Sequence, residues 1–557
     1  MNPVMEIKMK RLLCKKAKMF SLYLLATLLF VSTSWAQDAS PYDKFVQYYV
    51  SNNNFMGTVL VARDNEILFN KGFGSANLEW DIPNTPTTKF RLGSVTKQFT
   101  AAAILLLEER GKLNIDDPIK NYLPDTPEAW DKITVYNLLT HSAGIPNFTS
   151  FPEYQREQLF SHTPKEIVDI FRDKPLEFEP GEKMNYSNSG YILLGYLLEK
   201  VSGEKYQDFI QKNIFDTLGM KDSGYDSNSA IMPRRAAGYS PGPGGLINAD
   251  YVHMTIPFSA GALYSTTEDL LLWKQGLFGG KLLSKESLSK MTTPYKGNYG
   301  LGLTIGSDTD HRVIQHGGGI QGFVAQLSYY PDDKITVAVL SNVNSPAPFQ
   351  LAPKLAAVTR GEEVLLPSER KEISVPDTIL SQYVGTYEMR PGINFMITLE
   401  GGYLISQLSG QGKVPLFAES ETKFFTKVVE AEIEFFKDES GSVTHLILRQ
   451  SGAENKAVRT SDKVLVRKEI TVSPEILSQY VGTYEINPGF DLVITLEGDQ
   501  LYSQATGQGK VAIFAETETK FFLKVVDAQL EFFKDESGKV SHLVLHQGPA
   551  EIKAQRK

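Results

Sequence analysis

The sequence predicts a mixed α/β domain followed by two small all-β barrels. Strand-like segments at both ends of residues 38–361 enclose a middle with helical periodicity, which indicates one mixed α/β domain. Beyond it, residues 374–468 and 471–557 contain the same motifs twice. Of the 557 residues, 42% are hydrophobic and 22% are charged, which is ordinary for globular domains and sufficient for several cores.

The first domain is expected to begin with a hairpin in residues 57–77, where two apolar runs flank a polar turn. The longest helix is predicted over residues 94–111, because apolar residues recur there at helical spacing and Gly111 provides a stop. Shorter helices are expected at 135–139, 164–172, 190–201 and 267–276, and further strands at 299–305, 323–330 and 335–341.

The last part of the chain is a duplication with a constant offset. The motif L-S-Q-Y-V-G-T-Y-E occurs at 380–388 and 477–485, and E-F-F-K-D-E-S-G occurs at 434–441 and 531–538. Because both motifs recur after 97 residues, neither copy has gained or lost residues between them, and each is expected to be one compact unit.

Each repeat contains short alternating segments, such as 491–496 and 529–533, bounded by turns. This pattern is typical of a small antiparallel barrel, in which closure removes exposed edges. His445 and His542 occupy matching positions in the two copies. Since no other metal-ligand pattern accompanies them, we expect them to have structural roles and we expect no metal.

The first 36 residues have the pattern of a secretory signal peptide. Six basic residues precede an apolar run at 20–31, and residues 34–36 offer a cleavage site. The alternative is a retained membrane anchor, but the run is shorter than the ~20 residues that a spanning helix needs. Cys14 precedes the run, whereas a lipid-anchoring cysteine would follow it. We therefore predict a secreted or periplasmic protein with no stable membrane anchor.

Charge and cysteine content exclude other classes. Removal of residues 1–36 would leave 51 basic and 64 acidic residues, an excess of negative charge that makes nucleic acid an unfavourable partner. It would also remove the only cysteine, so the mature chain would have no disulfide, no thiol nucleophile and no thiolate metal site.

Ser94-Val95-Thr96-Lys97, at the start of the longest predicted helix, has the S-x-x-K pattern of a nucleophile with its base. A serine hydroxyl needs a base at neutral pH, and a helix places residues three apart on one face. The amide dipoles at a helix start also favour the negative charge of a developing alkoxide. Taken alone, however, the pattern is better explained as an N-cap serine followed by a surface lysine.

Two further motifs follow in order and favour the catalytic interpretation. The first is Tyr186-Ser187-Asn188, which taken alone also fits a polar loop. A neighbouring ammonium would favour the Tyr186 phenolate, so Tyr186 and Lys97 are expected to share proton transfer, and which of them is the general base stays open. Asn188 is expected to direct its amide at a substrate carbonyl or at Lys97.

The third motif, residues 316–319, reads H-G-G-G and also fits the oxyanion loop of an α/β-hydrolase. That fold requires a G-x-S-x-G serine, and residues 238–242 do read G-Y-S-P-G. The residue after such a serine must donate its amide hydrogen to the oxyanion, and Pro241 has none. The glycine run also follows this serine instead of preceding it. We therefore reject this alternative and keep Ser94 as the candidate nucleophile.

Together the three motifs resemble those of the serine β-lactamase and penicillin-binding-protein superfamily, in particular its branch of class C β-lactamases, D-aminopeptidases and esterases. The resemblance covers residues 38–361 and includes segments 138–144 and 261–266. It implies an antiparallel sheet flanked by helices plus a helical region, with the third motif on an edge strand. The duplicated tail is similar in architecture to the two eight-stranded barrels of family D-aminopeptidases.

The resemblance also implies roles for individual residues. Ser94 would attack, and Lys97 and Tyr186 would relay protons. The amides of Ser94 and Gly319 would hold the oxyanion, and His141 would be a structural loop residue. The residues expected to bind substrate are Asn188, His316, Gly318 and Gly319.

One departure from the family pattern concerns substrate. Where the family has K-T-G, this chain has His316, which is mostly neutral at pH 7, and Gly317, which has no side chain. A substrate carboxylate would lose support, so small esters or D-amino-acid peptides are favoured. We expect a secreted serine hydrolase that forms an acyl-enzyme without metal or cofactor. The alternatives are a penicillin-binding protein or β-lactamase, and an inactive protein that binds cell-wall fragments.

Overall fold

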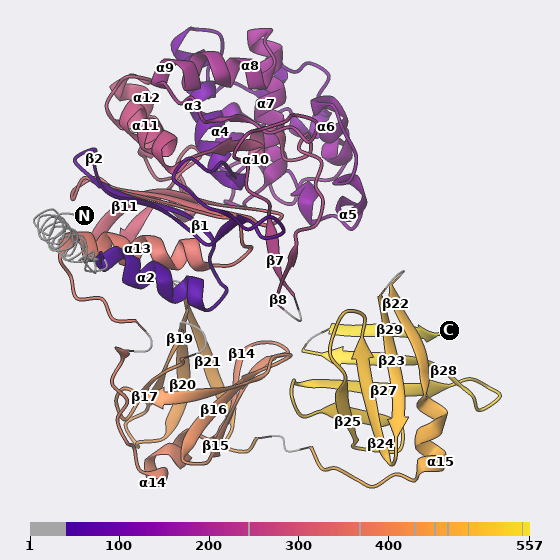
Figure 1. The fold of residues 1–557 in the computed structure, drawn as a ribbon. Coiled ribbons are helices and arrows are strands. Elements are labelled where there is room, and N and C mark those ends of the chain that lie inside the picture. Colours follow the sequence, from indigo (N-terminus) through magenta and orange to yellow (C-terminus); the bar gives the residue numbers. More distant parts are fainter. Residues whose placement is uncertain are drawn as a thin grey trace, which may run out of the picture.

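The computed structural model describes residues 40–242, 245–366, 369–427, 431–450, 453–464, 467–487, 490–548 and 550–557 (Figure 1). The predicted signal peptide, residues 1–36, lies outside the described residues. Within those ranges, no helix combines the length and apolar character needed to cross a membrane.

The centre of the first domain is a six-stranded antiparallel sheet in the order β10-β11-β12-β13-β1-β2. The first strand of the domain therefore pairs with its last, with Gly57 of β1 opposite Ser341 of β13. Every residue of β13 is buried, which explains why it reads as a continuous apolar run. The bounds are β1 Gly57–Arg63, β2 Glu66–Phe73, β10 Thr304–Asp308, β11 His311–Ile320, β12 Phe323–Tyr330 and β13 Ile335–Ser341.

Helices cover both faces of this sheet (Figure 1). On one face, α2 (Pro41–Ser51) and α13 (Ala347–Arg360) pack on a core that includes Phe69 and Val337. On the other face lies a larger helical region, in which α3 (Thr96–Glu109) is buried from Thr96 to Leu107 because it is apolar on nearly all sides. The other helices there are α4 Val135–Leu139, α5 Tyr154–Glu157, α6 Pro164–Arg172, α7 Asn188–Ser202, α8 Tyr206–Ile210, α9 Asp216–Leu218, α10 Phe258–Gly261, α11 Thr267–Phe278 and α12 Lys285–Thr292.

Two predicted elements differ from the structure. Ser94 does not open α3 but lies in the preceding 3₁₀ turn, η1 (Gly93–Val95). The strand predicted at 299–305 begins only at Thr304. The reason is the backbone of Gly302, whose φ of +73° belongs to a turn and breaks the extended run.

The remainder of the chain forms two closed eight-stranded barrels, β14–β21 and β22–β29, as predicted (Figure 1). Their cores repeat one another, since Tyr383 stacks on Phe435 at 4.4 Å and Tyr480 packs on Phe532 at 4.5 Å. The strands of barrel 1 are Gly385–Arg390, Ile393–Glu400, Tyr403–Leu408, Lys413–Ala418, Lys423–Phe425, Ala431–Lys437, Val443–Gln450 and Ala453–Ser461. Those of barrel 2 are Gly482–Asn487, Phe490–Glu497, Gln500–Ala505, Val511–Ala515, Lys520–Leu523, Ala528–Lys534, Val540–Gln547 and Ala550–Arg556.

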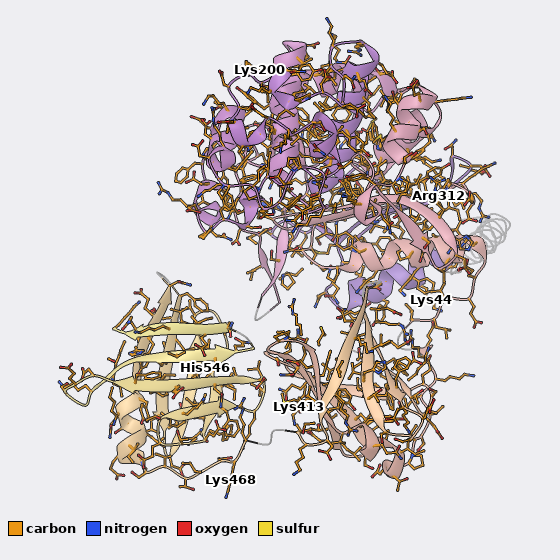
Figure 2. All side chains as sticks on the ribbon, turned by 180° about the vertical axis from the view of Figure 1, so that it is seen from behind. Lys44, Lys200, Arg312, Lys413, Lys468 and His546 are labelled. Carbon is orange, nitrogen blue, oxygen red and sulfur yellow. The ribbon has the colours of Figure 1, made fainter. Side chains whose placement is uncertain are left out.

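The duplicated histidines have equivalent places in the two barrels. His445 stacks on Phe436 at 4.8 Å, and His542 stacks on Phe533 at 4.9 Å. Barrel 1 follows the first domain closely along the chain. Figure 2 shows Lys44 of α2 on the side of the first domain nearest barrel 1, where its Nζ pairs with the Glu369 carboxylate at 2.6 Å.

Candidate active site

Lys97 is fully buried in the first turn of α3, directly beneath Ser94. Its Nζ lies 3.0 Å from Ser94 Oγ, 2.9 Å from Asn188 Oδ1 and 2.9 Å from the carbonyl oxygen of Ala260 in α10. The structure therefore brings the first motif and part of the second together, and adds a backbone acceptor that sequence did not indicate.

The surroundings of Lys97 favour its neutral amine. Nζ lies over the rings of Tyr186 and Tyr191, at 4.9 and 5.5 Å from their centroids. Burial lowers the pKa of Lys97 well below its usual range, and no carboxylate of the described chain offsets this effect. A neutral amine has two N–H donors, which Asn188 and Ala260 can accept, and one lone pair, which is left for the Ser94 hydroxyl.

Tyr186 is placed beside Ser94, but its electrostatics differ from the expectation. Burial raises the pKa of the Tyr186 phenol, and the hydrogen bond to Ser94 offsets this only in part. The expected phenolate is therefore disfavoured, because a buried anion without a cationic partner is costly and Lys97 is itself neutral. Tyr186 is better described as a neutral phenol that can donate a hydrogen bond.

Asn188, the first residue of α7, has both ends of its amide engaged. Its Oδ1 accepts from Lys97, and its Nδ2 lies 3.2 Å from Thr149 Oγ1 in the 3₁₀ turn η4 (Phe148–Ser150). Its backbone N–H donates to Asn147 Oδ1 at 3.0 Å. Of the two expected roles, this arrangement matches orientation of Lys97.

His316 lies on β11 and is buried against Tyr299. Its Nδ1 faces the Gly317 carbonyl at 2.6 Å, which assigns the hydrogen to Nδ1, and its Nε2 then accepts from the Tyr299 hydroxyl at 2.9 Å. Burial and, secondarily, the nearby Lys97 lower the pKa of His316 to about 3. The residue is thus neutral at pH 7.

The strand that carries the third motif approaches Ser94 through two glycines. A Cβ on Gly318 would overlap the Leu92 carbonyl and lie 2.9 Å from the Ser94 amide nitrogen. Gly93, with a φ of +51°, faces Gly319. A Cβ on Gly93 would lie 2.9 Å from the Gly319 backbone nitrogen. Close approach of β11 to the nucleophile therefore requires glycine on both sides.

The predicted edge position is correct only locally. β11 is the second strand of the sheet, but β10 pairs with residues 311–315 alone. The part of β11 from His316 to Ile320 has a strand on one side only. On the other side, this part of β11 packs against Gly93 and Ser94 of η1.

Gly317 is not directed at the nucleophile. Neighbouring strand residues point to opposite faces, and a Cβ on Gly317 would lie 2.5 Å from the ring of Phe349 in α13 and 2.9 Å from Gln326 Oε1. A threonine hydroxyl here would point away from the face that holds Ser94. The missing side chain at Gly317 thus does not explain a loss of carboxylate binding, contrary to the sequence argument.

His141 is more closely tied to the site than predicted. It has a φ of +55°, and its buried ring lies 4.2 Å from the Tyr186 ring and 4.7 Å from the Tyr299 ring. Its Nδ1 accepts from the Ser187 N–H at 3.2 Å, which fixes the second motif between Tyr186 and Asn188. Burial, more than nearby Lys97 and His316, lowers the pKa of His141 well below its usual range.

A pocket of about 380 Å³ opens beside Ser94. Among the described residues that line it, none carries a carboxylate, ammonium or guanidinium group. Most of these residues could not be predicted from the sequence, because they come from segments far apart in the chain. The lining consists of Gly93, Ser94, Phe148, Thr149, Tyr154, Asn188, Val252, Ile256, Pro257, Ala260, Gly261, Gly319, Ile320, Gln321 and Asn344.

Comparison with known proteins identifies the family of the first domain. A family model described as Beta-lactamase matches residues 43–360. The chain belongs to the beta-lactamase family. It is thus a serine hydrolase of the β-lactamase and penicillin-binding-protein type. A second model, a domain of unknown function (DUF3471), matches residues 369–460 and 466–556, one match for each barrel.

Relatives within the family extend beyond the first domain. Penicillin-binding protein 4* of Bacillus subtilis is 31% identical over 73% of this chain and 96% of its own length. An octameric penicillin-binding protein homologue from Pyrococcus abyssi is 27% identical, with a TM-score of 0.55 over 76% of this chain and all of that one. A D-stereospecific amidohydrolase from Streptomyces sp. is 25% identical, with a TM-score of 0.51 over 58% of this chain and all of that one.

Proposed function

We propose that this protein is a secreted serine hydrolase that cleaves small uncharged esters or amides through an acyl-enzyme on Ser94. The observation that carries the proposal is the buried Lys97 amine, 3.0 Å from Ser94 Oγ with both of its N–H groups able to bind fixed acceptors. A lysine with a depressed pKa is a suitable general base for a serine nucleophile at neutral pH.

In the first half-reaction, Ser94 Oγ attacks the substrate carbonyl carbon while its proton passes to Lys97 Nζ. The oxyanion forms next to the amides of Ser94 and Gly319, where β11 approaches the nucleophile. The leaving group must then receive a proton. Lys97 supplies it, with the neutral Tyr186 hydroxyl as the bridge. In the second half-reaction, water attacks the acyl-enzyme. The proton transfers use the same residues in the reverse direction, and Ser94 is regenerated.

The pocket lining supports an uncharged substrate. An ammonium group, as in a D-amino-acid amide, would require an acceptor of negative charge, and a carboxylate, as in a β-lactam, would require a cation. The described lining residues supply neither. We therefore rank neutral esters first, D-amino-acid peptides second and β-lactams third.

The test compares Ser94→Ala with Ser240→Ala, the serine of the rejected G-x-S-x-G segment. We expect Ser94→Ala to lose ester turnover and labelling by a fluorophosphonate, and Ser240→Ala to retain both. Substrates would be p-nitrophenyl acetate, a D-alanine anilide and a chromogenic cephalosporin. Turnover of the cephalosporin well above that of the ester would overturn the substrate ranking, and labelled Ser94→Ala protein would overturn the nucleophile. Secretion is tested separately, by a mature N-terminus at Gln37.

A further inference from the structure

Two segments that are far apart in the chain are in contact at the pocket beside Ser94. Gln321 lies in the turn between β11 and β12, and its Nε2 donates to Gln158 Oε1 at 2.6 Å. The hydroxyl of Tyr154 in α5 also hydrogen-bonds with the Gln321 side chain. This contact joins the strand of the third motif to the loop region over the pocket.

The partner side of this contact is held in place independently. Gln158 is buried, and its Nε2 donates to Gln155 Oε1 at 2.9 Å. Its carbonyl accepts from the His253 N–H at 2.8 Å. Tyr154 packs edge-on against Phe148 at 5.7 Å. Gln158 and Tyr154 therefore present a fixed surface to Gln321, and the contact is part of the fold.

Ser94 and Gln321 both line the pocket, and Gln321 is three residues beyond Gly318, which adjoins the Ser94 amide. At a strand rise of ~3.3 Å per residue, Gln321 lies roughly 10 Å along the chain from Gly318. The pocket is also lined by the polar side chains of Thr149, Asn188 and Asn344 and by the apolar side chains of Phe148, Val252, Ile256, Pro257 and Ile320.

The acyl part of the substrate is the group that fits this pocket. The leaving group must meet Tyr186 and Lys97, which supply its proton, and neither residue lines the pocket. The carbonyl oxygen is held at Gly319, so the acyl substituent continues along β11 towards Gln321. An apolar wall without charge suits a hydrocarbon chain, and the Tyr154–Gln321 contact blocks its extension.

We propose that Tyr154 and Gln321 form a stop that restricts the enzyme to short uncharged acyl groups. The proposal rests on the proposed function, because it assigns the pocket to the acyl half of an ester. It makes these two residues determinants of specificity, with no part in proton transfer.

The experiment measures kcat/KM for p-nitrophenyl acetate, butyrate, octanoate and dodecanoate. For the wild type we expect a steep fall between butyrate and octanoate. Gln321→Ala and Tyr154→Ala should each raise the octanoate-to-butyrate ratio by about tenfold, the scale on which hydrophobic pockets discriminate chain length, while acetate turnover changes by less than about threefold. Tyr154→Phe keeps the ring, so it should keep most of the length restriction.

Arg156→Ala is the matched control, because Arg156 lies in the same helix, is exposed to solvent and does not line the pocket. It should leave the ratio unchanged. If Gln321→Ala lowers turnover of all four esters equally, Gln321 only holds β11 in place and the proposal fails. A wild type that prefers dodecanoate also overturns it. Both outcomes leave the proposed function standing, whereas ester turnover that survives Ser94→Ala would remove that function first.

Discussion

Lys97 acquires its role from burial and hydrogen bonding. Its amine has two oxygen acceptors, Asn188 Oδ1 and the Ala260 carbonyl, and neither carries a charge. Desolvation therefore acts on Lys97 without compensation and lowers its pKa. The aromatic rings and neutral histidines around it complete an environment in which the base is already unprotonated before substrate binds.

The pH dependence follows from this arrangement. The active form of Lys97 is unprotonated, so acylation should rise with pH through a pKa well below the usual range of a lysine. Asn188→Asp would place a carboxylate at 2.9 Å from Nζ and raise the Lys97 pKa, because a neighbouring negative charge favours the ammonium. Activity should then fall at low pH and recover as the pH is raised.

The control for this prediction is Asn188→Ala, which removes the same hydrogen bond without adding charge. It should lower the rate at every pH without moving the acid limb of the profile. Stopped-flow acylation with p-nitrophenyl acetate over the full pH range measures both variants. Equal displacement of the limb in the two variants would show that charge at position 188 does not control Lys97.

His141 offers a second prediction, about positioning. His141→Asn should retain kcat within about threefold, because Asn tolerates a φ of +55° and its Oδ1 can replace Nδ1 as the acceptor for Ser187. His141→Ala would leave that buried N–H unsatisfied, at a cost of about 1–3 kcal/mol, and should also reduce kcat by releasing Tyr186. Urea denaturation and ester turnover report the two effects. An active alanine variant with unchanged stability would contradict this role.

At the scale of single residues, the sequence predicted which groups take part in catalysis but not whether they are protonated. The helical spacing of Ser94 and Lys97 sufficed to place them together, because that geometry is local. Burial disfavours the predicted Tyr186 phenolate, because the Tyr186 ring packs against His141 and Tyr299, and no motif indicated that packing. Tyr299, which binds His316, also escaped detection, since an isolated tyrosine among glycines has no distinguishing pattern.

At the scale of elements, the approach of β11 to η1 determines the oxyanion site. Gly318→Ala should reduce kcat/KM by about 10²–10³, as loss of an oxyanion donor does, because its Cβ would push the strand away from Leu92 and Ser94. Gly306→Ala in the neighbouring strand β10 is the control, since a Cβ there meets nothing within 4 Å and Gly306 does not line the pocket. Ester kinetics and circular dichroism of both variants test this, and equal losses would argue against it.

The sequence predicted helices most accurately where capping residues determine their ends. The helices at 135–139 and 164–172 match α4 and α6, and each begins at a capping box, on Thr134 and Thr163 respectively. The strand predicted at 299–305 had no such signal at its start. The order of strands in the sheet was not predicted, because the pairing of β1 with β13 joins the two ends of the domain.

At the scale of the whole molecule, the equivalent residues Gln547 and Gln450 each lie near the domain that precedes their barrel. Gln547, at the end of β28 in barrel 2, donates from Nε2 to the Gly410 carbonyl of barrel 1 at 3.0 Å. Its counterpart Gln450 lines a cavity of about 530 Å³ between barrel 1 and the first domain. The same end of each barrel sheet is therefore near the preceding domain.

The two barrels differ in how close they lie to the active site. The cavity between barrel 1 and the first domain includes Phe349 of α13, which lies against Gly317 on the rear face of β11. The described residues that line the pocket beside Ser94 all fall between Gly93 and Asn344. Barrel 2 has a separate core, which includes Tyr484 and Phe532, and it contacts barrel 1 through the turn at Gln547.

Removal of residues 466–557 should therefore leave ester kcat/KM within about twofold, because no described residue of barrel 2 reaches the pocket. Removal of residues 369–557 should lower the stability of the first domain, since it removes the Lys44–Glu369 ion pair and further exposes the partly exposed Phe349. In calorimetry, independent cores should give the full chain more than one transition, and the shorter deletion should abolish one of them without moving the transition of the first domain. Loss of ester activity in the shorter deletion would mean that barrel 2 contributes to catalysis. A single cooperative transition in the full chain would mean that the barrels and the first domain unfold as one unit.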